Sequence, residues 1–257
     1  MIRSLLRLLL IALPLACVEL VACSLGAEPL RMAETKDGEQ EVPAVRFDPV
    51  EQKIEGWTVF IEPRLLPGGD QEALGTRAIA MLRNHLERVA ILVSEPQLTQ
   101  LRSCELWLEY DHPRLNSMQY HPSERWLMDN GHDPRLTKKV HITQAEALLS
   151  RHHMRKHPAV ILHELAHAYH DTILGFNEPR ILSAYERVMA AGLYDRNLLY
   201  TGETVRHYGA TNHKEFFAES TESYFYKNDF YPFVAAELKE HDSETYELMR
   251  AIWGELE

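Results

Sequence analysis

The sequence is poor in cysteine. Only three cysteines occur in 257 residues, and two of them, Cys17 and Cys23, lie in an apolar N-terminal segment. If that segment is cleaved at Cys23 or beyond, Cys104 has no partner for an intramolecular disulfide. The mature chain therefore has no disulfide framework, and we expect its stability to come from a hydrophobic core. The 45% content of hydrophobic residues is sufficient for one.

The chain also lacks an excess of basic charge. Lysine and arginine number 27 against 38 aspartates and glutamates, and the formal net charge is −11. Binding to the phosphates of a nucleic acid requires a basic surface, so we expect no nucleic-acid partner. The acidic balance would suit basic substrates, although solubility alone explains it.

The N-terminal segment has no hydrophobic run long enough to span a bilayer comfortably. Arg3 and Arg7 precede an apolar stretch over residues 8–18, an arrangement typical of the hydrophobic region of an export signal. We therefore predict a signal peptide over residues 1–27 and a secreted or envelope-anchored protein.

Two cleavage sites compete within this segment. The sequence LVAC, which ends at Cys23, resembles a bacterial lipobox, in which the cysteine is lipidated, becomes the mature N-terminus and tethers the protein to a membrane. Cleavage near Gly26 or Ala27 would instead release a soluble secreted protein. A retained membrane anchor is the third alternative.

The rest of the chain predicts a linker followed by one folded domain. Residues 28–49 are polar without a clear period and predict a flexible linker, and residues 50–257 form the domain. Strand patterns precede helical patterns and no internal repeat is visible, so we predict an α+β fold. The predicted strands cover 57–61, 104–110 and 140–143, and the predicted helices cover about 71–90, 158–174, 181–191, 213–227, 232–240 and 243–254. Residues 111–135 predict either a loop or an irregular edge strand beside a cleft.

The most informative motif is HELAH, at residues 163–167. On a helix, His163 and His167 lie on one face and can share a tetrahedral zinc ion. Glu164 follows the first histidine, where its carboxylate can reach a water at the open position and act as general base. So short a motif also arises by chance, and a metal site therefore needs a third ligand.

His170 is one candidate for that ligand. The metzincin pattern would require glycine at 170 and histidine at 173, where the chain has Ile173, so that class is excluded. We therefore expect His170 either beside a ligand histidine or at the helix surface. His152, His153 and His157, which precede the helix, are expected at the surface.

Glu215 and Glu219 are better candidates, because they lie four residues apart on a predicted helix. One would bind the ion, and the other would accept a hydrogen bond from a ligand imidazole. An alternative fits the same spacing: Asn212 caps the helix, Glu215 completes a capping box, and Glu219 is an ordinary solvated carboxylate.

Two stretches resemble known metallopeptidases. HELAHAYHD, with a later E-x-x-x-E, is similar to the gluzincin-type zinc metallopeptidases. YGATNHKEFFAE, over residues 208–219, resembles the zinc-binding segment of the catalytic domain of anthrax lethal factor and of related proline-specific endopeptidases. In that family the segment reads Y-G-x-T-N-x-x-E-F-F-A-E. The resemblance covers about residues 158–226, so the choice of substrate does not carry over.

The resemblance implies a zincin-like domain, in which a small twisted sheet lies over the HExxH helix and the C-terminal half is helical. It implies Zn²⁺ as cofactor, with three ligands: His163, His167 and Glu215. It further implies that Glu164 is the general base, that the hydroxyl of Tyr208 stabilises the oxyanion, and that Glu219 is the hydrogen-bond partner of a ligand histidine.

We therefore expect an exported zinc metallopeptidase that hydrolyses peptide or protein substrates. One alternative is a zincin-like lipoprotein that binds peptides or cell wall without turnover. A purely structural zinc is the third, although structural sites are usually closed by four protein ligands.

Overall fold

Residues 44–256 of the chain are described by a computed structural model. The predicted signal peptide, the lipobox and residues 28–43 of the predicted linker lie outside these described residues. Within residues 44–256, no helix combines the length and the apolar character that a bilayer crossing requires.

The five strands of the main sheet lie in the first half of the described chain, and the second half is mostly helical. The strands are β1 (Val50–Ile54), β2 (Trp57–Ile61), β3 (Glu105–Leu108), β4 (Gln119–Tyr120), β5 (Lys139–Ile142), β6 (Asn197–Leu198) and β7 (Thr204–Val205). The α-helices are α1 (Glu72–Leu92), α2 (Gln97–Arg102), α3 (Glu124–Asp129), α4 (Arg151–Lys156), α5 (Val160–Tyr169), α6 (Pro179–Ala191), α7 (His213–Phe225), α8 (Ala235–His241) and α9 (Ser243–Trp253). The predicted α+β class is confirmed.

The main sheet has five strands in the order β1-β2-β3-β5-β4. The three central strands are parallel, and Leu106 of β3 lies opposite both Val59 of β2 and Val140 of β5. The edge strands β1 and β4 are antiparallel to their neighbours. The central strands are rich in apolar residues because both of their faces are covered. Residues 111–135, for which the sequence predicts either a loop or an irregular edge strand, contain the short edge strand β4.

A two-residue turn joins β1 to β2. Glu55 and Gly56 have φ values of 52° and 94°, and the pair that they connect is Ile54 with Trp57. Two positive φ values in succession suit a tight hairpin, and glycine adopts them without steric cost. β1 was not among the predicted strands, because its sequence VEQKI is mostly polar and exposed.

The packed part of the chain begins before the predicted boundary at Val50. The ring of Phe47 lies 5.6 Å from that of Trp107 on β3. The guanidinium of Arg135 donates to the carbonyl oxygen of Phe47 at 2.8 Å. The end of the predicted linker is therefore held on the sheet by an aromatic contact between residues far apart in the sequence.

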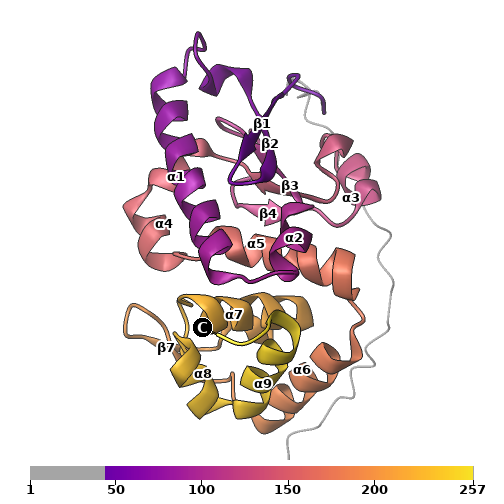
Figure 1. Ribbon diagram of the computed structural model, residues 1–257, viewed down its shortest axis with the longest axis vertical. Helices are drawn as coiled ribbons and strands as arrows, with labels where there is room; N and C mark the ends of the chain where they lie inside the picture. Colours follow the sequence, from indigo (N-terminus) through magenta and orange to yellow (C-terminus); the bar gives the residue numbers. More distant parts are fainter. Residues whose placement is uncertain (1–43, 257) are drawn as a thin grey trace, which may run out of the picture. The chain divides into compact units, whose positions relative to one another are not determined.

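Helix α5 lies between the sheet and the C-terminal helices (Figure 1), and it contacts β4 and β5 on one side and α7 on the other. It continues as a π-helical turn over His170–Leu174 and ends at Gly175, whose φ is 80°. Glycine adopts this conformation readily, so the predicted end at Gly175 is confirmed.

Helix α7 is the centre of the C-terminal half. It packs against α5, α6, α8 and α9, and every residue from Phe216 to Phe225 is buried. Trp253 at the end of α9 packs on both α5 and α7, because its ring lies 4.4 Å from that of Tyr169 and 5.8 Å from that of Phe217. Sheet and helices share one hydrophobic core, which fixes α5 and α7 against each other.

Candidate metal centre

Helix α5 presents His163 and His167 on the face that meets α7. Their rings are 4.7 Å apart, and the two Nε2 atoms are separated by 3.1 Å. The other faces of α5 are apolar and buried, so the helix cannot rotate without exposing its core side chains. The structure therefore directs one nitrogen of each predicted ligand histidine to the same point.

Glu215 comes from the first turn of α7. Its Oε2 lies 3.3 Å from His163 Nε2 and 3.4 Å from His167 Nε2. Asn212 caps the helix, since its side chain accepts from the amides of Lys214 and Glu215 at 2.9 and 3.1 Å. The predicted cap is confirmed, but the carboxylate of Glu215 faces the two histidines rather than completing a capping box.

The geometry of these three residues fits a zinc ion. Ligand atoms about 2.0–2.1 Å from a tetrahedral zinc lie about 3.3 Å from one another. The two nitrogens and the carboxylate oxygen are 3.1 to 3.4 Å apart. Two imidazoles and one carboxylate are also the donor set that catalytic zinc sites use, with a fourth position left open.

The charges around His163 also favour a cation. Burial opposes a positive charge on its ring, but the hydrogen bonds to Glu215 and Glu222 outweigh this and hold the pKa of His163 well above its usual value. Burial raises the pKa of Glu215, and its bonds to the two histidines reverse this and leave the pKa well below the usual range. The cluster is therefore stabilised by added positive charge, which a divalent ion would supply.

A second contact fixes the ring of His163. Its Nδ1 donates to Glu222 Oε1 at 2.6 Å, whereas Glu219 Oε1 lies 3.8 Å away. Glu219, which the sequence predicts as the partner of a ligand histidine, accepts instead from Asn228 Nδ2 at 2.9 Å. When His163 is neutral and Nδ1 keeps its proton, the free electron pair lies at Nε2, the tautomer that a metal ligand needs.

Glu222 was missed in the sequence analysis, although its spacing contains a signal. It lies seven residues after Glu215 and three after Glu219, so all three carboxylates share the face of α7 that meets α5. Glu219 and Glu222 are only 3% and 2% exposed. The alternative interpretation of Glu219 as a solvated carboxylate is therefore wrong.

Glu164 lies beside the histidines and is buried. Its Oε2 accepts from the backbone amide of Tyr120 in edge strand β4 at 2.8 Å. Burial raises the pKa of the Glu164 carboxyl. Strand β4 is in turn fixed to the end of α5, because the hydroxyl of Tyr120 donates to Asp171 Oδ2 at 2.8 Å and Lys138 forms an ion pair with the same oxygen.

Tyr208 borders the same pocket from the short 3₁₀ turn Tyr208–Ala210. Its side chain is half exposed, and partial burial together with the charge of Glu215 raises the pKa of its hydroxyl. His207 supports the turn by accepting from Gly209 N at 2.9 Å and stacking on Tyr194. His207 is buried, so it anchors Tyr208 rather than facing the pocket.

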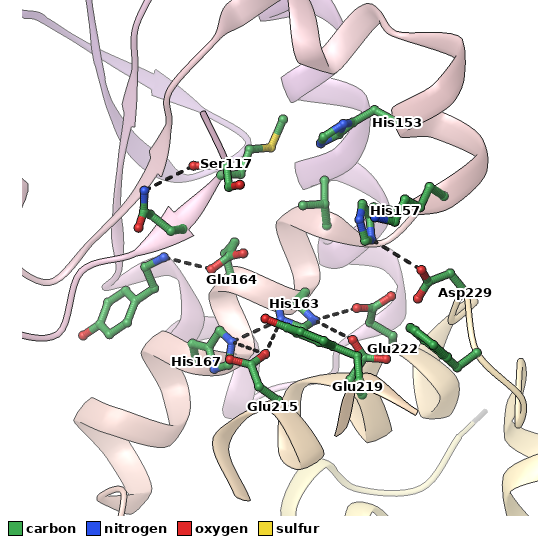
Figure 2. Close-up of a pocket in the computed structure, with 17 residues that line it drawn as sticks. Ser117, His153, His157, His163, Glu164, His167, Glu215, Glu219, Glu222 and Asp229 are labelled. Carbon is green, nitrogen blue, oxygen red and sulfur yellow. Dashed lines mark hydrogen bonds and ion pairs between the residues drawn. The ribbon is translucent and has the colours of Figure 1, made fainter. Parts of the chain in front are cut away.

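These side chains line one pocket of about 500 Å³. Figure 2 shows α5 crossing it, with Glu164 toward β4 and with His157 and Asp229 at the opposite end. The lining residues are Ser117, Met118, Gln119, Tyr120, His153, Lys156, His157, Val160, His163, Glu164, His167, Tyr208, Glu215, Glu219, Glu222, Asp229 and Phe230. The edge strand, the histidines and the carboxylates therefore face a common space that a peptide segment could enter.

Three histidines lie elsewhere than the sequence predicts. His153 and His157 were expected at the surface, but they line the pocket and are partly buried. His170 lies neither at the surface nor beside a ligand histidine. The π-helical turn directs its ring into the core between Phe176 and Phe217, where it is 0% exposed.

The chain matches no protein-family model, and comparisons with curated proteins and with solved structures return no match. What remains is the convergence of two histidines and a glutamate from two helices, with a buried carboxylate beside them, on the floor of an open pocket.

Proposed function

We propose that this chain is an exported zinc-dependent metallopeptidase with a zincin-like domain. The observation that carries the proposal is the convergence of His163 Nε2, His167 Nε2 and Glu215 Oε2 within 3.1 to 3.4 Å of one another. Three protein ligands beside a pocket leave a coordination position open, as catalytic zinc sites do. The proposed export rests on the sequence of residues 1–27.

The metal and the protein would have separate roles in peptide hydrolysis. When bound, zinc supplies Lewis acidity that polarises a peptide carbonyl and makes a water acidic near neutral pH. Glu164 accepts a proton from that water as the water oxygen bonds to the carbonyl carbon. The amide bond then breaks, and Glu164 delivers the proton to the leaving amine.

The surroundings of Glu164 suit a general base. The amide of Tyr120 holds one carboxylate oxygen, Oε2, so the group has a fixed orientation while Oε1 stays available to exchange a proton. Burial raises the pKa of Glu164, which makes the carboxylate a stronger base than one in water.

Two further elements would position the substrate. The raised pKa of Tyr208 keeps its hydroxyl protonated, so that it can donate to the carbonyl oxygen as negative charge develops. Strand β4 forms the edge of the sheet, and Ser117–Tyr120 border the pocket. An extended peptide could therefore add to this edge by backbone hydrogen bonds.

The experiment compares zinc-loaded wild type with Glu164→Gln on a diverse peptide library, which includes cell-wall peptides, read by mass spectrometry. We expect the variant to keep its zinc and to lose about 10²–10⁴-fold in hydrolysis. Glu87→Gln, an exposed change on α1, is the matched control and should cleave normally. Cleavage by Glu164→Gln at the wild-type rate would show that the mechanism is wrong. A zinc-loaded wild type that binds peptides and cuts none would favour the alternative of a binding module.

A further inference from the structure

Two buried carboxylates at one end of the pocket lack protein partners. Asp229 is 1% exposed, and neither of its carboxylate oxygens accepts a hydrogen bond from the described residues. Glu222 bonds His163 through Oε1, but its Oε2 is likewise without a donor. An ionised carboxylate buried without a partner costs free energy, which a cation at this place would recover.

No described lysine or arginine forms an ion pair with Asp229, although the charge of Lys156 opposes the rise of its pKa. The nearest basic atom to Asp229 is His157 Nδ1, at 3.8 Å, which is beyond hydrogen-bond range. Burial lowers the pKa of His157 to about 3, so the imidazole is neutral at physiological pH. Lys156 borders the pocket, but none of the described ion pairs joins it to Asp229.

The whole pocket carries an excess of negative charge. Among the described residues that line it, one lysine, Lys156, stands against five carboxyl groups: Glu164, Glu215, Glu219, Glu222 and Asp229. A substrate group that enters with a positive charge is therefore attracted to this end of the pocket.

The pocket also has apolar lining residues. Met118, Val160 and Phe230 line it together with the carboxylates. A pocket with apolar walls and buried acidic groups fits a side chain with a methylene stem and a charged tip. Lysine and arginine are the side chains that have this form.

The acidic end is held in place before any ligand arrives. Asn228, which is fully buried, donates to Glu219 through its side-chain amide and accepts from the amide of Phe230. The backbone amide of Tyr200 donates to the carbonyl of Asp229 at 2.8 Å. These bonds fix the loop that holds Asp229 against α7, and a rigid support lowers the entropic cost of binding.

We infer that Asp229 and Glu222 form a subsite for the basic side chain of a lysine or arginine in the peptide substrate. The inference rests on the proposed function, since it names the class of peptide that the metallopeptidase site takes. The ammonium or guanidinium group donates to the free oxygens of both carboxylates while its stem lies against Val160 and Phe230. This contact places one particular substrate residue at a fixed distance from the zinc ligands.

Binding to the catalytically disabled protein tests the inference separately from hydrolysis. The probe is a positional peptide library on zinc-loaded Glu164→Gln protein, with lysine or uncharged norleucine fixed at each position in turn. We expect lysine to bind at least about tenfold more tightly than norleucine at one position, the effect of a charge-assisted hydrogen bond in a buried site. When Asp229→Asn is added, lysine and norleucine peptides should bind about equally well at that position. Asp129→Asn, an exposed change on α3, should leave the preference for lysine unchanged.

Several outcomes would overturn the inference. They are equal binding of lysine and norleucine at every position, no peptide binding at all, or a preference that survives Asp229→Asn. A zinc content of two per chain that falls to one in Asp229→Asn would show that the carboxylates hold a second ion instead. Failure of the wild type to cleave any peptide bears on the proposed function alone, because the binding ratio is measured without turnover.

Discussion

Glu222 Oε1 lies 2.6 Å from His163 Nδ1, the shortest contact between α7 and a histidine of α5 in the described chain. A carboxylate that accepts from the far nitrogen of a ligand histidine fixes its tautomer and orients its ring. Glu222 therefore acts on the metal site through His163.

Replacing Glu222 tests this relationship. We expect Glu222→Gln to weaken zinc binding about 10- to 100-fold, because the amide holds the imidazole less firmly and makes it less basic. Competition with a chromophoric chelator gives the dissociation constant. Glu219→Gln is the matched control, since its carboxylate lies 3.8 Å from the same nitrogen. If Glu219→Gln weakens zinc binding more than Glu222→Gln does, Glu219 is the hydrogen-bond partner of the ligand histidine, as the sequence predicts.

Zinc should stabilise the folded chain through Glu215. At a free zinc concentration 100 times the dissociation constant, the free energy of unfolding should rise by about 2.7 kcal/mol, because the assembled site exists only in the folded state. Glu215→Ala should remove most of this increase. Thermal unfolding with and without zinc measures both. An unchanged zinc-dependent increase in Glu215→Ala would mean that the third ligand lies elsewhere, with Glu219 or His170 the next residues to test.

Asp229→Asn should stabilise the metal-free protein at neutral pH. Burial raises the pKa of Asp229 to about 7, so below pH 4 the carboxyl is protonated in both folded and unfolded chains and costs nothing. As the pH rises from 4 to 7 the unfolded chain loses its proton first, and the folded state is destabilised by about 4 kcal/mol. The variant should therefore be more stable than the wild type at pH 8 and equally stable at pH 4. Chemical denaturation at both pH values measures the difference, and a variant that is less stable at pH 8 would contradict the argument.

His170→Leu should stabilise the protein most strongly in acid. Burial lowers the pKa of His170 to about 3, and neither ring nitrogen has a hydrogen-bond partner among the described residues. Between pH 6.5 and 3 the unfolded chain binds a proton that the folded chain excludes, so stability falls by about 1.4 kcal/mol per pH unit. Leucine has no proton to bind, so the variant does not lose this stability. Denaturation should show that the variant exceeds the wild type in free energy of unfolding by more at pH 5.5 than at pH 7.5. An equal difference at both pH values would contradict the assigned pKa.

Elements with strong local signals could be predicted from the sequence. Helix α1 shows its apolar face at helical spacing, α7 has Asn212 as its cap, and α5 ends at the predicted Gly175. Strand β1 and helices α2 and α4 could not, because they are short and mostly polar and depend on tertiary contacts. Local periodicity carries no information about such contacts.

The same distinction applies to the candidate site. The spacing of His163 and His167 within one helix, and the motif around Glu215, indicated which residues converge, and the structure brings them together. Asp229 and His157 could not be found in this way, because they reach the pocket from a loop after α7 and from α4. Glu222 had a usable signal in its heptad spacing from Glu215, which a search for pairs four residues apart overlooks.

The contact between Asp171 and strand β4 has a consequence for how the cavity can move. Asp171 holds both Tyr120 and Lys138, and the lysine side chain is 47% exposed. Salt in the surrounding solution weakens such a solvent-facing ion pair, whereas the interior bonds between α5 and α7 are shielded from it. Rising ionic strength would therefore loosen the strand that borders the cavity while the histidines of α5 keep their positions.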